Sequence, residues 1–302
     1  MEASGHEVVT IFYPSFHFLY LPSNIKAFSI VSAKLDNKYP AGRSSTETER
    51  LHKQHKLVKS AFGDLILCPV ELSKPGLRIL DSGTADGYFL YDLGSQLAHP
   101  DSAELIGTDI VDYPDTIGLP KNIKLYKQNI LEDWPKDWDG TFDFVHQRTV
   151  MANVPTFEEG VKVMERLIKL VKPGGWIQIV DGAMPTDPID ECDLPSVKIF
   201  KTIGTFLKGI GLNPIAGNQI FDMLDSAGGL KNMGRKDVAS KLGKGASSGE
   251  LEKIGYEELE GLVAVVAPAL EGIPNPPIAA DEFQRLLPLA LEEAKTKEVE
   301  IA

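Results

Sequence analysis

Cysteine is scarce in this chain of 302 residues. Cys68 and Cys192 are its two cysteines, and their separation fits neither a metal-ligand motif nor a disulfide framework. Two isolated thiols are typical of an intracellular protein whose cysteines stay reduced. The sequence therefore predicts no metal site, and neither cysteine is a candidate for chemistry.

Long apolar runs and an excess of basic residues are missing as well. The longest apolar run, LVAVVAPAL, is interrupted by Pro268 and falls well short of the roughly 20 residues of a membrane-spanning helix. The N-terminal sequence MEASGHEVVT lacks the basic start and apolar stretch of a secretory signal. A formal net charge of −12 disfavours nucleic acid, because binding to phosphates depends on clustered Lys and Arg. We therefore expect a cytoplasmic protein with a small-molecule or protein partner and no membrane or nucleic-acid partner.

What the sequence does contain is an alternation of strand and helix signals. The sequence predicts five strands: the short apolar runs LRILDS and ELIGTDI, and the further segments NIKLYKQNI, FDFVHQR and WIQIVDG. Thr156 and Glu159 have the spacing of a helix-capping box, as do Ser44 and Glu47 near the N-terminus. Strands that alternate with helices predict an α/β fold with a doubly wound, mostly parallel sheet.

The segments around this sheet predict four parts. These are an aromatic-rich arm and helical cap (residues 1–62), a ligand-binding core (63–185), a lid inserted over the active site (186–218), and the end of the core with covering helices (219–302). His55 falls within the apolar stripe of the predicted N-terminal helix. Such a histidine is either a hydrogen-bonded core residue or a group that faces a pocket from the cap.

The run LRILDSGTADG, residues 77–87, is the most informative motif. A strand ends near Asp81 and enters a turn with Gly83, Ala85 and Gly87, the arrangement at which α/β sheets bind nucleotide-like cofactors. Gly83 permits close approach of the backbone to a ligand, and Gly87 permits tight packing of the next helix. Because glycine-rich strand exits also occur as plain turns, this motif needs support from the following strands.

Polar residues follow the next two strands. Asp109 ends the second strand, where an acidic side chain can accept both hydroxyls of a ribose. Gln128, Asn129 and Ile130 end the third, where a side-chain amide and a backbone N–H can contact an adenine edge. Asp81 at the head of the glycine loop disfavours a pyrophosphate and favours an ammonium group. Together these residues predict an adenosine ligand with an amino-acid tail, a description that S-adenosylmethionine (SAM) fits.

These motifs resemble those of class I SAM-dependent methyltransferases, which have a Rossmann-like fold, and specifically the UMTA/LaeA-like group of fungal secondary metabolism. The resemblance covers ILDSGTADG, GTD, FDFVHQR and LVKPGGWIQIVD, and it extends upstream to YPAGRSSTETERLHKQHKL and downstream through the last helices. It implies a SAM-dependent methyltransferase that acts on O or N of a small-molecule substrate. One departure is Ala85, which stands where the group commonly has glycine. Another is the C-terminal sequence VEIA, which predicts an incomplete seventh strand.

The resemblance also implies roles for individual residues. The implied cofactor residues are Asp81, Gly83 and Gly87 beside the methionine part of SAM, Asp109 at the ribose, Asn129 and Ile130 at the adenine, and His146 and Arg148 alongside. If the acceptor is a hydroxyl, His146 is the first candidate for a general base and Asp181 the second. Tyr39 is a further candidate, either as part of the cavity wall or facing the sulfonium.

Two other functions stay open at this stage. One is a SAM-fold protein that catalyses a non-methylating cyclisation or pericyclic step, with His146 or Asp181 polarising the substrate. The other is a LaeA-like regulatory protein that acts through partners. A homodimer is one expected assembly.

Overall fold

A computed structural model describes residues 6–12, 45–112, 118–189 and 194–301. The chain divides into two compact units. The first, which we call the sheet unit, consists of residues 1–12, 64–181 and 218–237. The second, the helical unit, consists of residues 13–63, 182–217 and 238–302. Each unit is thus assembled from three separate stretches of the chain.

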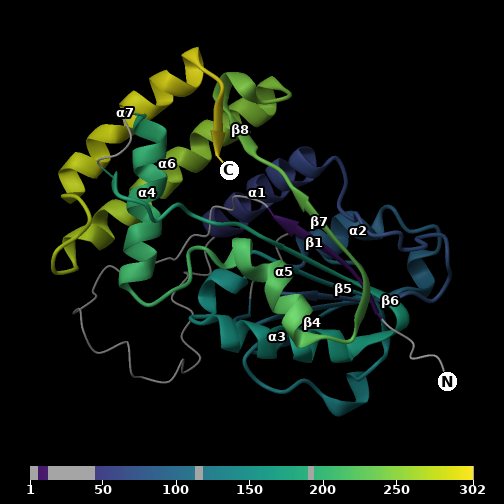
Figure 1. The fold of residues 1–302 in the computed structure, drawn as a ribbon. Helices are drawn as coiled ribbons and strands as arrows, with labels where there is room; N and C mark the ends of the chain where they lie inside the picture. Colours follow the sequence, from purple (N-terminus) through teal and green to yellow (C-terminus); the bar gives the residue numbers. More distant parts are fainter. Residues whose placement is uncertain (1–5, 13–44, 113–117, 190–193, 302) are drawn as a thin grey trace. The chain divides into compact units, whose positions relative to one another are not determined.

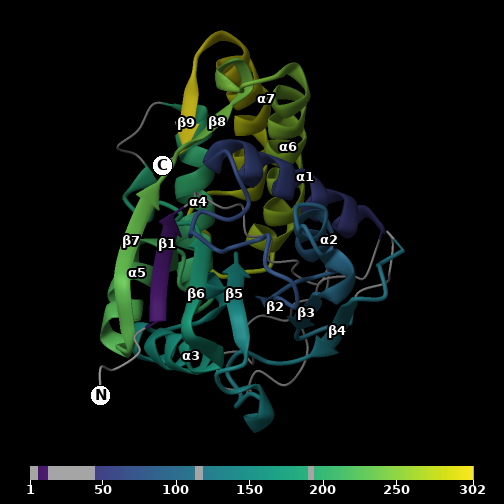
Figure 2. The same cartoon turned by 90° about the vertical axis from the view of Figure 1, so that its right-hand side faces the viewer.

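A seven-stranded sheet forms the centre of the sheet unit, with the strand order β4-β3-β2-β5-β6-β1-β7. Figure 2 shows these strands side by side. Every neighbouring pair is parallel. The strands are β1 (His6–Phe12), β2 (Arg78–Ser82), β3 (Glu104–Asp109), β4 (Ile123–Lys127), β5 (Phe142–Arg148), β6 (Val171–Asp181) and β7 (Leu230–Asp237). Because all strands run in one direction, their carboxyl ends lie at one edge of the sheet.

The central strands are built from continuously buried residues. In β2 every residue from Ile79 to Ser82 is buried, and β3 is buried from Leu105 to Thr108. Such continuous burial is typical of parallel strands that are covered on both faces. β4, by contrast, lies at the sheet edge, and Ile123 is its one buried residue.

Helices cover both faces of this sheet (Figure 1). α2 (Tyr88–Gly94) follows the glycine loop on one face, whereas α3 (Phe157–Leu170) and most of α5 (Ala216–Ala227) lie on the other. α3 begins as predicted, because the Thr156 side chain accepts a hydrogen bond from the backbone N–H of Glu159. The predicted doubly wound α/β fold is confirmed.

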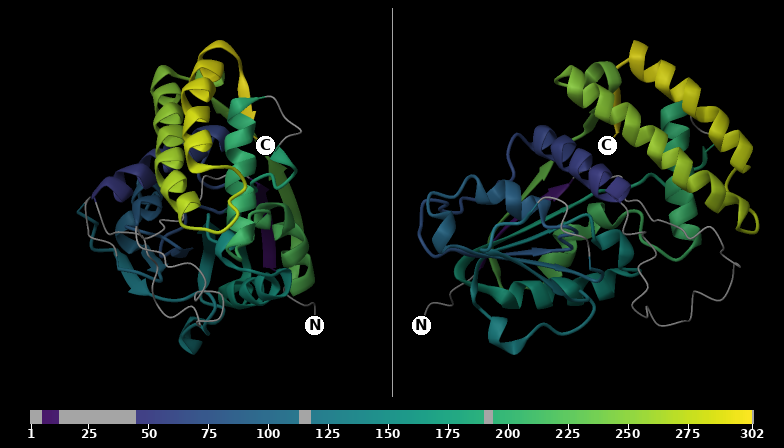
Figure 3. Two further views of the ribbon diagram at one scale, coloured as in Figure 1. Left: turned by 90° about the vertical axis from the view of Figure 1, so that its left-hand side faces the viewer. Right: turned by 180° about the vertical axis from the view of Figure 1, so that it is seen from behind.

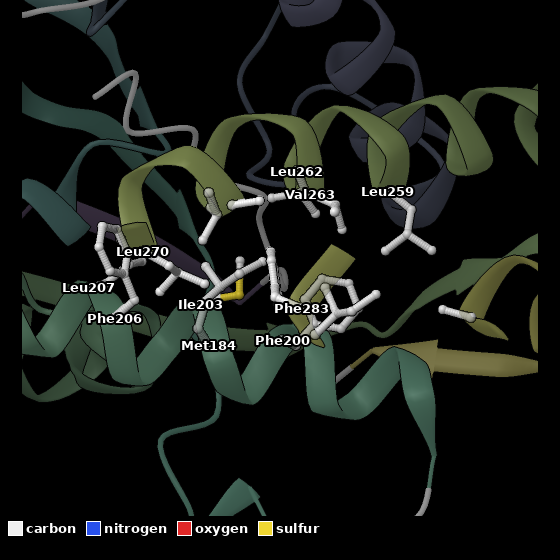
Figure 4. Close-up of a cluster of buried hydrophobic side chains, with 14 of the residues drawn as sticks. Met184, Phe200, Ile203, Phe206, Leu207, Leu259, Leu262, Val263, Leu270 and Phe283 are labelled. Carbon is white, nitrogen blue, oxygen red and sulfur yellow. The ribbon is translucent and has the colours of Figure 1, made fainter. Parts of the chain in front are cut away.

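Helices dominate the second unit. They are α1 (Ser45–Phe62), α4 (Pro195–Gly209), α6 (Gly249–Glu271) and α7 (Ala280–Thr296), accompanied by the antiparallel strands β8 (Ser240–Leu242) and β9 (Val299–Ile301). α7 packs between α4 and α6 (Figure 3, left). The facing sides form an apolar core that includes Phe200, Leu262 and Phe283 (Figure 4). Within the described residues, no helix has both the length and the apolar character needed to cross a membrane.

The structure also corrects one expectation about the sheet. The five predicted strands are present, but β1 and β7 complete a seven-stranded sheet, so the expected gap at the seventh strand is wrong. β1 comes from the segment predicted as an N-terminal arm, and VEIA contributes β9 to the helical unit instead. The reason is that β1 pairs with β6 and β7, partners far away in the sequence that no local pattern specifies. The placement of residues 186–218 as a lid stays a prediction.

Candidate functional site

The carboxyl edge of the sheet gathers polar side chains from several strands. Asp81 lies in β2 directly between Gly107 of β3 and His146 of β5. Asp109 ends β3 and Asp181 ends β6. Asp81, His146 and Asp181 are each at most 2% exposed. Buried groups of this kind need specific partners, so their contacts define what the site can do.

Asp81 and His146 form a buried hydrogen-bonded pair. Nδ1 of His146 lies 2.7 Å from Oδ1 of Asp81. The His146 ring stacks on Phe89 of α2, with ring centroids 3.8 Å apart and planes 6° from parallel. Burial lowers the pKa of His146 below its usual value, against the opposing effect of Asp81. Because an ionised carboxylate only accepts hydrogen bonds, the neutral His146 ring carries its proton on Nδ1 and donates it to Asp81.

The loop after β2 has the conformation that its glycines predict. Gly83, Ala85 and Gly87 have left-handed φ angles of +74°, +53° and +87°. At Gly83 a Cβ atom would collide with Val150, so glycine alone satisfies both the backbone conformation and the available space. Ala85 adopts its left-handed conformation at a cost of roughly 1 kcal/mol. Its backbone N–H donates to Asp109 Oδ2 over 3.0 Å, which ties the loop to the end of β3.

Asp109 is a half-buried carboxylate with backbone donors on both oxygens. Oδ2 accepts from Ala85, and Oδ1 accepts from the backbone N–H of Val111 at 3.2 Å. Burial raises the pKa of Asp109 to about 6, and the backbone hydrogen bonds act in the opposite direction. Additional donors would favour the ionised carboxylate, and a ribose offers two hydroxyl donors.

The loop after β4 is folded on itself around Gln128. Its Nε2 donates to the backbone carbonyl of Asn129 at 3.0 Å and to that of Asp133 at 3.3 Å. The backbone N–H of Gln128 donates to the carbonyl of Asp109 over 2.8 Å. Asn129 and Ile130 are therefore held in a compact loop beside the end of β3. The structure thus brings the predicted adenine residues next to the predicted ribose residue.

The segment after β5 is held by Asp181. Oδ2 of Asp181 accepts from the backbone N–H groups of Val150 at 2.9 Å and Met151 at 2.7 Å. Thr149 in this segment has a φ of +58°, which is uncommon for a β-branched residue. Asp181 therefore stabilises a strained turn. The general-base role expected for it stays a prediction, and these contacts argue against that role.

Phe89 and Arg148 complete this part of the edge. The guanidinium carbon of Arg148 lies 5.7 Å from the centre of the Phe89 ring, within the range of a cation–π contact. Phe89 therefore contacts both His146 and Arg148, which lie in the last part of β5. Sequence reasoning missed Phe89, although its position two residues after Gly87 was a usable signal. Tyr39 lies outside the described residues.

A second buried polar pair, Ser82 and Gln147, was also missed. Ser82 Oγ donates to Gln147 Oε1 over 3.0 Å, and both side chains are fully buried. Gln147 Nε2 and Thr84 Oγ1 have no hydrogen-bond partner within the described part of the chain. Buried polar atoms of this kind mark places where a ligand or water is held. The glutamine next to the candidate His146 in FDFVHQR was the signal that could have identified this pair.

Two chemistries find no support in the described residues. No three His, Cys, Asp or Glu side chains gather there as a metal site requires. Cys68 is buried, and burial raises the pKa of its thiol to about 12. Since the thiolate is the nucleophilic form, Cys68 is a poor nucleophile.

Comparison with known proteins gives consistent matches. Residues 51–190 match a family described as a methyltransferase domain. The chain is 34% identical over 253 residues to the N-methyltransferase sirN of Leptosphaeria maculans, a match that covers 83% of this chain and 87% of sirN. It is 31% identical over 256 residues to the N-methyltransferase gliN of Aspergillus fumigatus, which covers 83% of this chain and 89% of gliN.

Proposed function

The chain belongs to the class I SAM-dependent methyltransferases, in the group of fungal secondary metabolism, and we propose that it methylates a nitrogen atom of a small molecule. The methyl donor is SAM. The observation that carries the proposal is the pair of acidic strand ends, Asp81 and Asp109, on either side of a left-handed glycine loop. The choice of nitrogen over oxygen is supported by the names of the two relatives, both N-methyltransferases.

The residues at the carboxyl edge fit such a donor. Asp81 would pair with the ammonium group of the methionine part, because opposite charges attract strongly where water is excluded. Asp109 would accept the ribose hydroxyls, and Asn129 with Ile130 would contact the adenine. At Gly83 the Val150 side chain fills the space that a Cβ atom would need, so glycine keeps the loop in the conformation that places its backbone at this edge. The unpartnered buried atoms of Gln147 and Thr84 indicate a polar ligand at the same edge.

Bound SAM supplies a methyl group that is already activated by the positive sulfur. What remains for the protein is to exclude water and to align nitrogen, methyl carbon and sulfur. Such alignment can lower the activation free energy by several kcal/mol. A neutral amine attacks through its own lone pair, and its proton leaves to solvent after the transfer. A dedicated base is therefore optional. His146 is hydrogen-bonded to Asp81, and Asp181 accepts hydrogen bonds from the backbone. These contacts leave both side chains poorly suited to act as a general base.

Transfer of an isotopically labelled methyl group tests the function. Purified protein is incubated with SAM that carries a deuterated methyl group and with matched pairs of small molecules that differ only in N–H or O–H at the accepting position. We expect labelled N-methyl product from the N–H member of a pair. A labelled O-methyl product would overturn the choice of nitrogen. A product with the mass of the substrate would instead indicate cyclisation, and absence of any binding to S-adenosylhomocysteine would refute a SAM site.

Two variants distinguish the loss of a ligand contact from a general effect on folding. Asp109→Asn removes the negative charge and replaces one of the two acceptor oxygens with an NH2 donor, so we expect the affinity for S-adenosylhomocysteine to fall about tenfold or more. Asp101→Asn is the matched control, since Asp101 is an exposed residue of the short helical turn Pro100–Ser102 before β3. Its affinity should equal that of the wild type. Equal losses in the two variants would remove Asp109 from the site.

A further inference from the structure

The pair formed by Asp81 and His146 is more restrained than a surface hydrogen bond. The two residues lie directly opposite each other on neighbouring strands. Their side chains are 4% and 1% exposed, and Nδ1 and Oδ1 are 2.7 Å apart. A distance this short is typical of a hydrogen bond to an ionised group. Water does not compete for either partner, so the geometry of the pair is set by the protein.

The His146 ring is also fixed by aromatic contacts. Phe89 stacks on it in a nearly parallel arrangement at 3.8 Å, and the Phe144 ring lies 6.3 Å away at 35°. Rotation of the imidazole about its χ angles would break the stacking contact with Phe89. The Nδ1–H vector is therefore aimed at Asp81 before any ligand arrives, and the other charged groups that affect this pair are Arg148 and Asp109.

We propose that His146 is a positioning residue that acts through Asp81: it holds one carboxylate oxygen so that the other is presented to the amino group of the cofactor's methionine part. This inference rests on the proposed function and sharpens it. A carboxylate without such a donor can rotate about its Cβ–Cγ bond, and ordering it would reduce the binding free energy. With His146 in place the carboxylate is ordered in advance.

Three roles for His146 make different predictions. A general base would affect turnover and leave cofactor binding unchanged. A purely structural residue would affect every ligand of the site alike. A positioning residue that acts through Asp81 would affect only ligands that carry the amino group. The discriminating measurement is therefore a comparison of two cofactor-like ligands, not a single activity value.

Calorimetric titration with S-adenosylhomocysteine and with 5′-methylthioadenosine provides this comparison, because the second ligand shares the adenosine thioether and lacks the amino-acid tail. His146→Phe keeps a flat ring against Phe89 and removes the Nδ1 donor. We expect it to weaken S-adenosylhomocysteine binding about tenfold or more and to change 5′-methylthioadenosine binding less than about twofold. His146→Asn, whose amide can reach the Nδ1 position, should restore most of the lost affinity.

A double variant tests whether the effect passes through Asp81. If it does, Asp81→Asn and Asp81→Asn with His146→Phe should bind S-adenosylhomocysteine equally weakly. Additive losses, equal losses for both ligands, or an unchanged affinity in His146→Phe would each overturn the inference. A wild-type protein that binds neither ligand would instead overturn the proposed function.

A measurement on the wild-type protein keeps the inference testable if His146→Phe does not fold. The His146 Nδ1–H proton should be visible by NMR, because burial protects it from exchange. We expect its resonance to shift when S-adenosylhomocysteine is added and to stay in place with 5′-methylthioadenosine. The same shift with both ligands, or none with either while both bind, would contradict the positioning role.

Discussion

The sheet unit and the helical unit use buried polar residues differently. In the sheet unit they gather at one edge, where Asp81, His146 and Gln147 lie on neighbouring strands and Asp181 ends another. In the helical unit buried polar residues instead connect one helix to another. Glu293 of α7, for example, accepts hydrogen bonds from the backbone N–H and the hydroxyl of Ser196 at the start of α4. The contrast teaches that burial of a polar group alone does not mark a functional site; convergence of several such groups on one place does.

Contacts between α1 and α6 of the helical unit are a second case in which polar side chains have a structural role. Ion pairs join the helices, among them Arg50 with Glu258 at 3.7 Å, Lys53 with Glu257 at 2.7 Å and Lys56 with Glu250 at 2.7 Å. The exposed ones contribute little individually. His55 of α1 is buried in this unit, as its apolar stripe predicted. The charged groups that α1 and α6 share are explained by helix packing.

The largest effect that we expect comes from a cavity-forming substitution in the apolar core of the helical unit. Phe283 is fully buried among α4, α6 and α7 (Figure 4). Phe283→Ala should lower the free energy of unfolding by about 3–5 kcal/mol, through lost burial and the cavity that remains. Urea unfolding measures this. Leu289→Ala in the same helix is the control, because the Leu289 side chain is 56% exposed. This variant should change the free energy of unfolding by no more than about 0.5 kcal/mol.

A smaller effect should follow from adding one methyl group to the glycine loop of the sheet unit. Gly83→Ala combines a left-handed φ with a collision against Val150, and we expect a loss of about 2–4 kcal/mol of unfolding free energy. Gly76→Ala has a similar φ of +70° with open space around it, so it should cost only about 1 kcal/mol. Identical losses in denaturant titrations would show that the collision with Val150 is absent in solution.

The pH dependence of cofactor binding tests the sheet unit's acidic edge. Asp109, with a pKa of about 6, is protonated below that pH and must ionise to accept two ribose hydroxyls. Affinity for S-adenosylhomocysteine should therefore be constant above pH 7 and fall about tenfold by pH 5. Calorimetry of Asp109→Asn should give a weaker affinity that no longer falls with pH, and a persistent decline would assign the titration to another group.

The smallest effect concerns Ala85. Ala85→Gly relieves the left-handed conformation at φ +53° but adds flexibility to the unfolded chain, so the net gain should be about 0.5 kcal/mol. Ala103→Gly, at an ordinary φ of −80°, should instead lose about 1 kcal/mol. Thermal unfolding of the two variants gives the comparison. A destabilised Ala85→Gly would mean that the Ala85 methyl group has favourable packing contacts.

Much of the site was predictable because it follows from local patterns. The glycine loop, the acidic residues at the ends of β2 and β3 and the Thr156 cap are each encoded within a few neighbouring residues. Phe89 and Gln147 could have been found from their positions beside these motifs. The place of β1 could not, because a strand of seven residues carries no information about which distant strands will pair with it.

The sequence by itself determined the elements and the chemical character of the edge, since turn conformation and strand burial depend on residues that are close in the chain. Only the tertiary structure decided that His146 donates to Asp81 and that Asp181 fixes a turn. The first pair is separated by 65 residues, and its protonation state depends on burial and stacking, which arise once the strands and α2 have packed.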